Sequence, residues 1–367
     1  MKHRCLAALL FVTALAGQQW QVAKPGYRYE FPRDHFSHPH FQTEWWYYTG
    51  NLRAGDGHRF GFELTFFRQA QHLMPQQMAA SDAVWQPDQI YVAHLALSDI
   101  DGQQFFHMER LNRAGPGLAG AGLIDRKYWN GNWEAKWISL EMGEQELQAV
   151  CDNLTLNIRI QPEKPLVIHG ENGISIKGPL PGEASHYLSF TRLNAMGKLR
   201  WKNRDFDVTG LAWMDHEFFS ETADNDLAGW DWFAIQLDNH EELMLYRLRN
   251  KSGNSRYSSG TFVDTNGHAQ YLDASEFDIK PAATWHSRDS GATYPISWNI
   301  SVPSLGLDLT ERTVLADQEL FDAKRLTPTY WEGAVSYDGT LRDIKVHGAG
   351  YLEMTGYANR SPAAVLP

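Results

Sequence analysis

Residues 43–52 read TEWWYYTGNL, a run of aromatic and β-branched residues with no proline. Residues of these types favour β-strands. Successive side chains of a strand point to opposite faces, so Glu44, Trp46 and Tyr48 share one face, and Trp45 and Tyr47 share the other. The stretch therefore predicts a strand with aromatic side chains on both of its faces.

The same alternation recurs along the whole chain, and strong helical periodicity is scarce. Turn signals rich in Gly, Asn and Asp separate the segments, at 54–57, 101–102, 172–173, 266–267 and 338–339. Two segments, 82–88 and 141–148, are predicted as short helical or loop insertions. The predicted strands are 43–52, 59–68, 90–99, 104–109, 132–142, 154–161, 187–193, 198–204, 206–213, 231–237, 242–249, 257–264, 296–302, 333–337 and 348–355.

Many short strands joined by tight turns predict an antiparallel all-β fold. Closing the sheets into barrels would remove their exposed edges. A chain of 367 residues exceeds what one hydrophobic core usually holds, so we expect two domains in tandem, 25–217 and 218–360, with the change near 215–225. The aromatic content of 13%, with 14 Trp, suits an aromatic core or a ligand cavity.

Residues 1–16 have the pattern of a cleaved signal peptide, so we expect a periplasmic or secreted protein. Lys2 and Arg4 form a basic start, residues 6–15 are apolar, and Ala14-Leu15-Ala16 is a small-x-small cleavage site. The alternative is a buried helix at the start of a cytosolic domain. The apolar run is too short to span a bilayer, and no later stretch is apolar enough, so the protein is not expected to be membrane-spanning.

Removal of this segment takes the formal charge from −11 to −13, because 31 basic residues then face 44 acidic ones. An acidic protein repels phosphate, which argues against nucleic acid or an anionic membrane surface as a partner. Cys151 is then the single cysteine, so no intrachain disulfide is expected, and a core position is more plausible for it than a nucleophilic role.

Three blocks place rare residues at fixed offsets: DHFSHPH with EWWYYTG (34–50), GLAWMDHEFF with GWDWFAIQL (210–237), and YWEGAV with GYLEMTGY (330–357). Together they resemble the family of carotenoid 1,2-hydratase (CrtC) and the AttH-like proteins, some of which are labelled predicted secreted hydrolases. The resemblance extends over about residues 27–357. It implies two tandem lipocalin-like β-barrels, a lipophilic small molecule as substrate or cargo, and no cofactor. It also implies an ABC-type lipoprotein-release transporter as a partner.

The resemblance assigns a hydratase-type site to Asp215, Trp213 and His186. Hydration of an unactivated alkene needs a strong general acid in a dry pocket, and a carboxyl kept neutral by burial can serve. In the resembling hydratases the Asp of an aromatic-x-Asp stretch is this acid, and a His followed by aromatic residues can orient the water or hold the acid. Leu188 stands where the hydratases prefer another aromatic ring, which argues against carotenoid hydration itself. The alternative for Asp215, His216 and Glu217 is a structural polar network between the barrels.

Other residues of the blocks are expected to bind the ligand or to support the barrels. The predicted ligand-binding set is Trp46, Tyr48, Tyr187, His216, Trp230 and Trp232. Glu44 is expected to be a buried carboxylate at the closed end of a barrel, with an arginine ion pair as the favoured structural role. Glu332 and Glu353 receive the same interpretation, and Glu217 is assigned to the same structural group.

The chain contains no strong metal or nucleotide motif. His35, His38 and His40 could supply imidazole ligands, but Pro39 constrains the loop and no His-Glu-x-x-His helix accompanies them, so no metal is predicted. There is no G-x-S-x-G elbow, P-loop or G-x-G-x-x-G in a βαβ context.

Three functional hypotheses follow. The first is an acid–base enzyme acting on a lipophilic substrate, by hydration or a related isomerisation or cyclisation, with its site at the junction of the two barrels. The second is a non-catalytic carrier or accessory protein of an export system, and the third is a secreted hydrolase. Asp215 facing a cavity beside His186 would favour the enzyme, whereas an ion pair between Asp215 and an arginine would favour the carrier.

Overall fold

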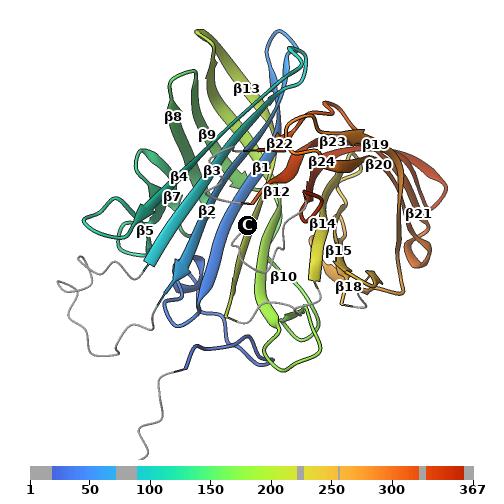
Figure 1. Cartoon of the computed structure of the whole chain (residues 1–367), viewed down its shortest axis with the longest axis horizontal. Helices are drawn as coiled ribbons and strands as arrows, with labels where there is room; N and C mark the ends of the chain where they lie inside the picture. Colours follow the sequence, from blue (N-terminus) through green and yellow to red (C-terminus); the bar gives the residue numbers. More distant parts are fainter. Residues whose placement is uncertain (1–18, 72–88, 221–226, 255–256, 322–327, 359–367) are drawn as a thin grey trace, which may run out of the picture.

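The computed structural model describes residues 19–71, 89–220, 227–254, 257–321 and 328–358. The predicted signal peptide and the predicted insertion at 82–88 lie outside these residues. The described chain forms two antiparallel sheets, of 13 and 11 strands, and its helical residues are confined to two short 3-10 turns, Arg33–His35 and Pro303–Leu305 (Figure 1). The prediction of an all-β fold is confirmed. Within the described residues, no helix is long and apolar enough to cross a membrane.

The first sheet runs in the order β4-β3-β2-β1-β13-β12-β9-β8-β7-β6-β5, and the short β10 and β11 pair with β12. Each strand pairs mostly with its neighbour in sequence, as tight turns require. The bounds are β1 Thr43–Ala54, β2 Arg59–Ala70, β3 Gln89–Asp99, β4 Gln104–Arg113, β5 Ala119–Gly122, β6 Lys127–Asn130, β7 Trp133–Ser139, β8 Glu144–Cys151, β9 Leu154–Pro162, β10 Val167–Ile168, β11 Ser175–Ile176, β12 Ala184–Trp201 and β13 Arg204–Phe219.

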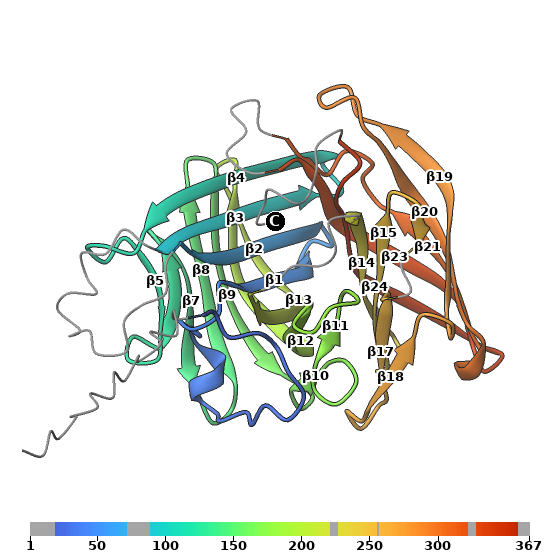
Figure 2. The ribbon, with the colours of Figure 1, turned by 60° about the horizontal axis from the view of Figure 1, so that its bottom comes forward.

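This sheet curls into a barrel (Figure 2), and side chains connect strands near its two ends. The Asn130 amide on β6 donates to the carbonyl of Tyr91 on β3 at 3.2 Å, and Asn112 on β4 donates to the Asn130 side chain at 2.6 Å. Inside, a large apolar core includes Trp46, Trp133 and Trp137. Of the two faces predicted for 43–52, the one that carries Trp46 and Tyr48 points into the barrel interior.

The second sheet runs in the order β18-β17-β15-β14-β24-β23-β21-β20-β19, with β16 beside β15 and β22 beside β23. It encloses a separate apolar core that contains Phe233, Trp298 and Trp331. The bounds are β14 Leu227–Leu237, β15 Glu242–Asn250, β16 Gly253–Asn254, β17 Ser259–Val263, β18 Ala269–Asp273, β19 Asp278–His286, β20 Thr293–Val302, β21 Leu307–Thr313, β22 Glu319–Leu320, β23 Tyr330–Leu341 and β24 Ile344–Met354.

Three local predictions were wrong. Residues 144–151 form strand β8 rather than a helical or loop insertion. The segments predicted as separate strands at 187–193 and 198–204 belong, up to Trp201, to one strand, β12, with an irregular register between Phe190 and Leu193, and Lys202-Asn203 turn into β13. The turn predicted at 338–339 is strand interior, and β23 turns into β24 at Arg342-Asp343, which have φ of 52° and 64°.

The outer faces of the two sheets pack against each other at what we call the junction. Residues of β1, β12 and β13 contact residues of β14, β15, β23 and β24 in an apolar cluster that includes Tyr47, Trp213, Trp232 and Tyr351. Gln236 of β14 donates to the carbonyls of Thr191 and Ala212 at 2.8 and 2.9 Å. The first sheet ends at Phe219 and the second begins at Leu227, so the boundary proposed between 217 and 218 falls inside β13.

Candidate active site at the junction

Strand β13 sends Asp215 and His216 to opposite faces of the first sheet. Asp215 lies between Tyr47 of β1 and Ser189 of β12 in the strand register, and it faces the second sheet. His216 stacks on Trp46 at 5.0 Å between ring centroids, inside the barrel. Period-2 alternation thus separates two polar clusters that are adjacent in sequence.

The Asp215 carboxyl is held by three donors and forms no ion pair among the described residues, although Lys177, which pairs with Glu217, is close enough to interact with it electrostatically. Tyr187 donates to Oδ2 at 2.6 Å, and the Trp213 indole donates to Oδ1 at 2.6 Å. The Ser189 hydroxyl also donates to Oδ1. Burial raises the pKa of Asp215 to about 7, although all three hydrogen bonds favour the charged form. Asp215 is therefore an acid that changes its protonation state near neutral pH.

Residues of the second sheet hold two of these donors in place. The Trp232 indole of β14 donates to the Tyr187 hydroxyl at 2.9 Å. His169, which follows β10, lies with Nε2 2.7 Å from Ser189 Oγ and Nδ1 2.8 Å from Thr261 Oγ1 of β17. Burial lowers the pKa of His169 to about 3, so its ring is neutral at ordinary pH. The acid is thus fixed by groups from both sheets.

Three further carboxyl groups, Glu63, Glu332 and Glu353, are packed at the junction. Tyr47 donates to Glu332, Tyr330 donates to Glu63 Oε1 at 3.3 Å, and the Trp230 indole donates to Glu353 Oε1 at 3.1 Å. Burial raises the pKa of Glu63 to about 7 and that of Glu353 to about 8. Burial and the two neighbouring carboxyl charges raise the pKa of Glu332 well above its usual range. These groups are predominantly protonated below neutral pH.

The arginine pairs predicted for Glu332 and Glu353 are absent from the described ion pairs, so that interpretation was wrong. Their partners are tyrosine and tryptophan donors instead. Glu217 does have a cation: Lys177 Nζ lies 3.1 Å from its Oε1 and over the ring of Tyr246 at 4.1 Å. The junction therefore contains more carboxyl groups than cations.

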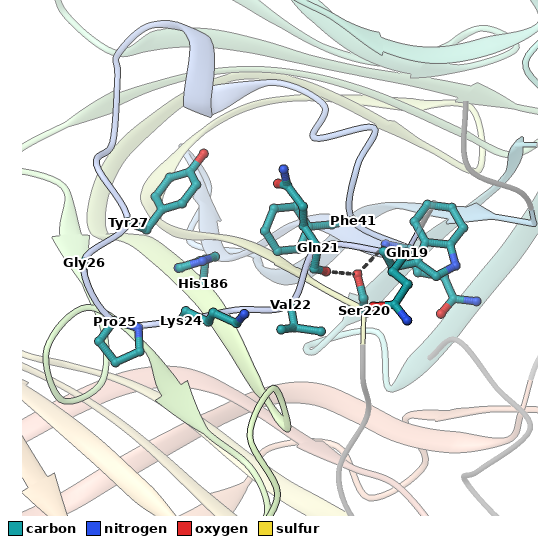
Figure 3. Close-up of a pocket in the computed structure, with 12 residues that line it drawn as sticks. Gln19, Gln21, Val22, Lys24, Pro25, Gly26, Tyr27, Phe41, His186 and Ser220 are labelled. Atoms are coloured by element: carbon teal, nitrogen blue, oxygen red, sulfur yellow. Dashed lines mark hydrogen bonds between the residues drawn. The ribbon is translucent and has the colours of Figure 1, made fainter. Parts of the chain in front are cut away.

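His186 does not contact Asp215, and its expected role beside the acid was wrong. Alternation along β12 sends His186 to the face opposite Tyr187 and Ser189. It stacks near Tyr27 at 4.4 Å and lines a pocket of about 880 Å³ under residues 19–27, with Phe41 and Ser220 (Figure 3). Burial lowers the pKa of His186 to about 4, so it too is neutral at ordinary pH.

Glu44 has the arginine partner that the sequence predicted. Arg68 Nε donates to Oε2 at 3.0 Å, and both side chains are fully buried. His38 and His216 place ring nitrogens 2.6 and 2.8 Å from Oε1, and the His38 backbone N–H donates to Oε2. The histidine and arginine partners hold the pKa of Glu44 well below its usual range despite its burial. Glu44 is a structural anchor of the barrel.

His38, Glu44 and His216 are also close enough together to be considered as metal ligands. However, the two oxygens of Glu44 already accept four N–H contacts, one of them from Arg68. A cation placed there would face that guanidinium, so hydrogen bonding accounts for the cluster better than metal binding does. His35 stacks on Trp137 at 4.2 Å and takes no part in the cluster.

The predicted ligand-binding residues separate into two places. Tyr187, Trp230 and Trp232 lie at the junction, around Asp215 and Glu353. Trp46, Tyr48 and His216 lie inside the barrel, where Tyr48 donates to Gln145 Oε1 at 2.5 Å and the Trp46 indole donates to the His35 carbonyl. The sequence interpretation missed Ser189, His169, Glu63 and Thr261. None of them belongs to a motif, and only the packing of the sheets brings them to the site.

Comparison with known proteins assigns the chain to a family. The model of the AttH-like family matches residues 22–357. This chain belongs to the AttH-like family. A crystal structure of an AttH from Nitrosomonas europaea has 33% identity and a TM-score of 0.81, and the match covers 92% of this chain and 100% of that one.

Kievitone hydratase is a more distant match, both in sequence and in structure. The kievitone hydratase of Fusarium solani subsp. phaseoli is 23% identical over 225 residues, which are 59% of this AttH-like chain and 61% of that protein. The crystal structure of kievitone hydratase from Nectria haematococca has 15% identity and a TM-score of 0.67, over 86% of this chain and 89% of that one. The second likeness shows a shared fold alone.

Proposed function

We propose that this AttH-like protein adds water to an alkene of a lipophilic, isoprenoid-like molecule, with Asp215 as the general acid at the junction. The observation that carries the proposal is the state of Asp215: buried, without an ion pair among the described residues, and with a pKa of about 7. General acids work best when their pKa lies near the working pH. The relationship to proteins named hydratases supports the same reaction class.

In the proposed reaction Asp215 gives one proton to the substrate and regains one from water. The Asp215 proton goes to one alkene carbon, and the π electrons form the new C–H bond, which leaves a carbocation on the other carbon. A water oxygen bonds to that carbon and returns one proton to the Asp215 carboxylate. Tyr187, Ser189 and Trp213 stabilise the carboxylate while it is charged.

Aromatic rings at the junction suit a cationic intermediate. Trp213 and Trp232 meet edge to face at 6.1 Å, and Tyr47 meets Trp232 at 5.3 Å. Ring faces attract a cation through their quadrupole, which would offset the cost of forming charge away from water. Leu188, which the resemblance placed in a ring position, lies on the opposite face of β12 from Tyr187, so other rings supply this wall.

The second candidate is a non-catalytic carrier of a lipophilic molecule, for which the same aromatic junction is suitable. A covalent hydrolase has less support. His169 Nε2 lies 2.7 Å from Ser189 Oγ, but Asp215 contacts Ser189 rather than His169, so the three do not form a Ser-His-Asp triad. Export to the periplasm or exterior and partnership with an ABC-type transporter are part of the proposal, and they rest on residues 1–16 and on the family resemblance.

The test compares the wild type with Asp215→Asn and with the control Asp207→Asn, an exposed position on the same strand. Each protein is incubated with farnesol, geranylgeraniol or a carotene in ¹⁸O-labelled water, and lipid extracts are examined by mass spectrometry. We expect labelled tertiary alcohol from the wild type and the control, and at least about 100-fold less from Asp215→Asn. Unaltered lipid bound equally by all three proteins would establish the carrier instead.

A further inference from the structure

Three polar residues form a row inside the second sheet, away from the junction. Trp298 of β20 is directly opposite Glu311 of β21, and Glu311 is directly opposite Tyr337 of β23. Directly opposite residues of neighbouring antiparallel strands point to the same face, with Cβ atoms about 5 Å apart. All three are at most 1% exposed, and Trp298 and Tyr337 belong to the apolar core of this sheet. The row therefore faces the apolar core that the second sheet encloses.

Each member of the row has a polar atom without a hydrogen-bond partner in the part of the chain that the structure describes. These atoms are the indole Nε1 of Trp298, Oε2 of Glu311 and the phenol oxygen of Tyr337. Buried polar atoms are nearly always paired, because an unpaired one has lost its water without compensation. Three such atoms on three adjacent strands indicate that something outside the chain satisfies them.

Burial favours the uncharged forms of the row. Burial raises the pKa of Glu311 well above its usual range, and its other oxygen accepts a hydrogen bond from Thr313 at 3.3 Å. Burial and the neighbouring Glu311 also raise the pKa of Tyr337. Arg247 stacks on the Trp298 ring at 4.8 Å, but its guanidinium is bound to Asp231 at 2.6 Å. The row thus offers one N–H donor and two groups that both donate and accept.

The position of the Tyr337 ring depends on a glycine of the next strand. A Cβ atom at Gly350 would lie 3.1 Å from Cε2 of Tyr337 and 1.8 Å from the carbonyl oxygen of Ala234. The absence of a side chain at 350 lets the ring lie against β24. Alternation along β23 also separates Tyr337 from Glu332, which belongs to the junction.

We propose that Trp298, Glu311 and Tyr337 form a second binding site, which takes the hydroxyl or carbonyl end of an uncharged apolar molecule. The surrounding core, with Phe233 5.4 Å from Trp298, holds the apolar part. A charged end is disfavoured: a carboxylate would meet no free cation there, and an ammonium would require Glu311 to ionise, which its burial opposes. This site lies on the opposite face of β23 from the junction and does not depend on the reaction proposed there.

The test follows the Trp298 indole N–H by NMR in protein labelled with ¹⁵N-tryptophan, the signal being assigned by its loss in Trp298→Phe. The full chain is titrated with 1-decanol, decylamine and decanoate, which share a chain length and differ in the charge of the end group. We expect a saturable shift with decanol alone. Glu311→Leu and Tyr337→Phe should each weaken decanol binding about tenfold or more, whereas the exposed control Tyr271→Phe should not.

Two results would overturn the proposal. If the Trp298 N–H contacts a persistent water that decanol does not displace, ordered water satisfies the row. If no probe shifts the signal and both Glu311→Leu and Tyr337→Phe raise the melting temperature, the row is dry and unsatisfied. Glu311→Gln keeps the shape and polarity of the site, so it provides the comparison if Glu311→Leu does not fold.

Discussion

At the scale of single residues, the same type of side chain takes opposite charge states in neighbouring places. Glu44 is buried but faces Arg68 and two histidines, and the pKa of its carboxyl is lowered. Asp215 is buried among neutral donors, and its pKa is raised to about 7. Burial alone always disfavours the charged form, so the partners decide the outcome. One carboxyl therefore anchors the barrel and the other is available as an acid.

Replacing Glu44 by Gln should lower the free energy of unfolding by about 3–5 kcal/mol, because Arg68 would remain as a buried charge without its partner. Chemical denaturation monitored by tryptophan fluorescence measures this. The exposed pair of Lys198 and Asp207 is the control, and Lys198→Met should change the free energy by about 1 kcal/mol or less. Equal effects of the two substitutions would mean that Glu44 is not an anchor.

Tyr187→Phe should raise the pKa of Asp215 by about one unit or more, since the lost hydrogen bond favours the carboxylate. The pH dependence of the reaction, or of the Asp215 carboxyl signal in ¹³C NMR, measures the shift. Tyr271→Phe, at an exposed position, should leave the pKa unchanged. A pKa that falls in Tyr187→Phe would show that Tyr187 does not donate to this carboxyl.

At the scale of strands, the alternation of side chains predicted most strands of the sheets. The same alternation limits which residues of β12 can contact Asp215. Because His186 and Tyr187 are adjacent in a strand, they cannot both face Asp215. Which of them does so depends on the pairing of β12 with β13, and the sequence does not contain that register. His169 comes from a loop segment without a motif, and Trp232 and Thr261 come from the other sheet, so long-range packing had to place them.

The error at 338–339 has a specific physical origin. Asp-Gly is a strong turn signal, but Gly339 is needed for close approach between strands: a Cβ there would lie 2.0 Å from the Asp308 carbonyl oxygen. The two residues that do turn, Arg342 and Asp343, have positive φ without being glycine. The residue types alone did not show that Gly339 lies inside a strand and that Arg342-Asp343 form the turn.

Gly339→Ala should therefore disrupt the pairing of β21 with β23 and destabilise the protein by about 2 kcal/mol or more. Gly55→Ala is the matched control, because a Cβ at Gly55 meets no atom within 4 Å. Thermal unfolding of the two variants measures the difference. Equal melting temperatures would contradict the close-approach explanation.

At the scale of the whole molecule, the two sheets meet at several carboxyl groups whose pKa values are raised by burial. Asp215, Glu63 and Glu353 have pKa values raised to about 7, 7 and 8, from ordinary values of 3.8, 4.5 and 4.5. The folded protein thus binds protons that the unfolded chain has already released. The all-β fold was predictable from the alternation and the turns, but this shared acidic face was not, because its members are distant in sequence.

Stability should consequently depend on pH with a definite sign. The contribution of these groups is fully present below about pH 4, is lost as pH rises, and is gone above about pH 8. Urea unfolding between pH 5 and 8.5 should show falling stability for the wild type and a flatter profile for Glu353→Gln. A profile that rises with pH, or one that Glu353→Gln does not alter, would show that these carboxyls are already charged in the folded state.

The central claim is that Asp215 is a buried acid which is uncharged below neutral pH. The most direct measurement is ¹³C NMR of protein labelled at the aspartate side-chain carboxyl, with the Asp215 signal identified by its loss in Asp215→Asn. We expect a titration with its midpoint near pH 7. A signal that is already that of a carboxylate at pH 5 would rule out Asp215 as the acid, because an aspartate charged at that pH cannot supply the proton for hydration.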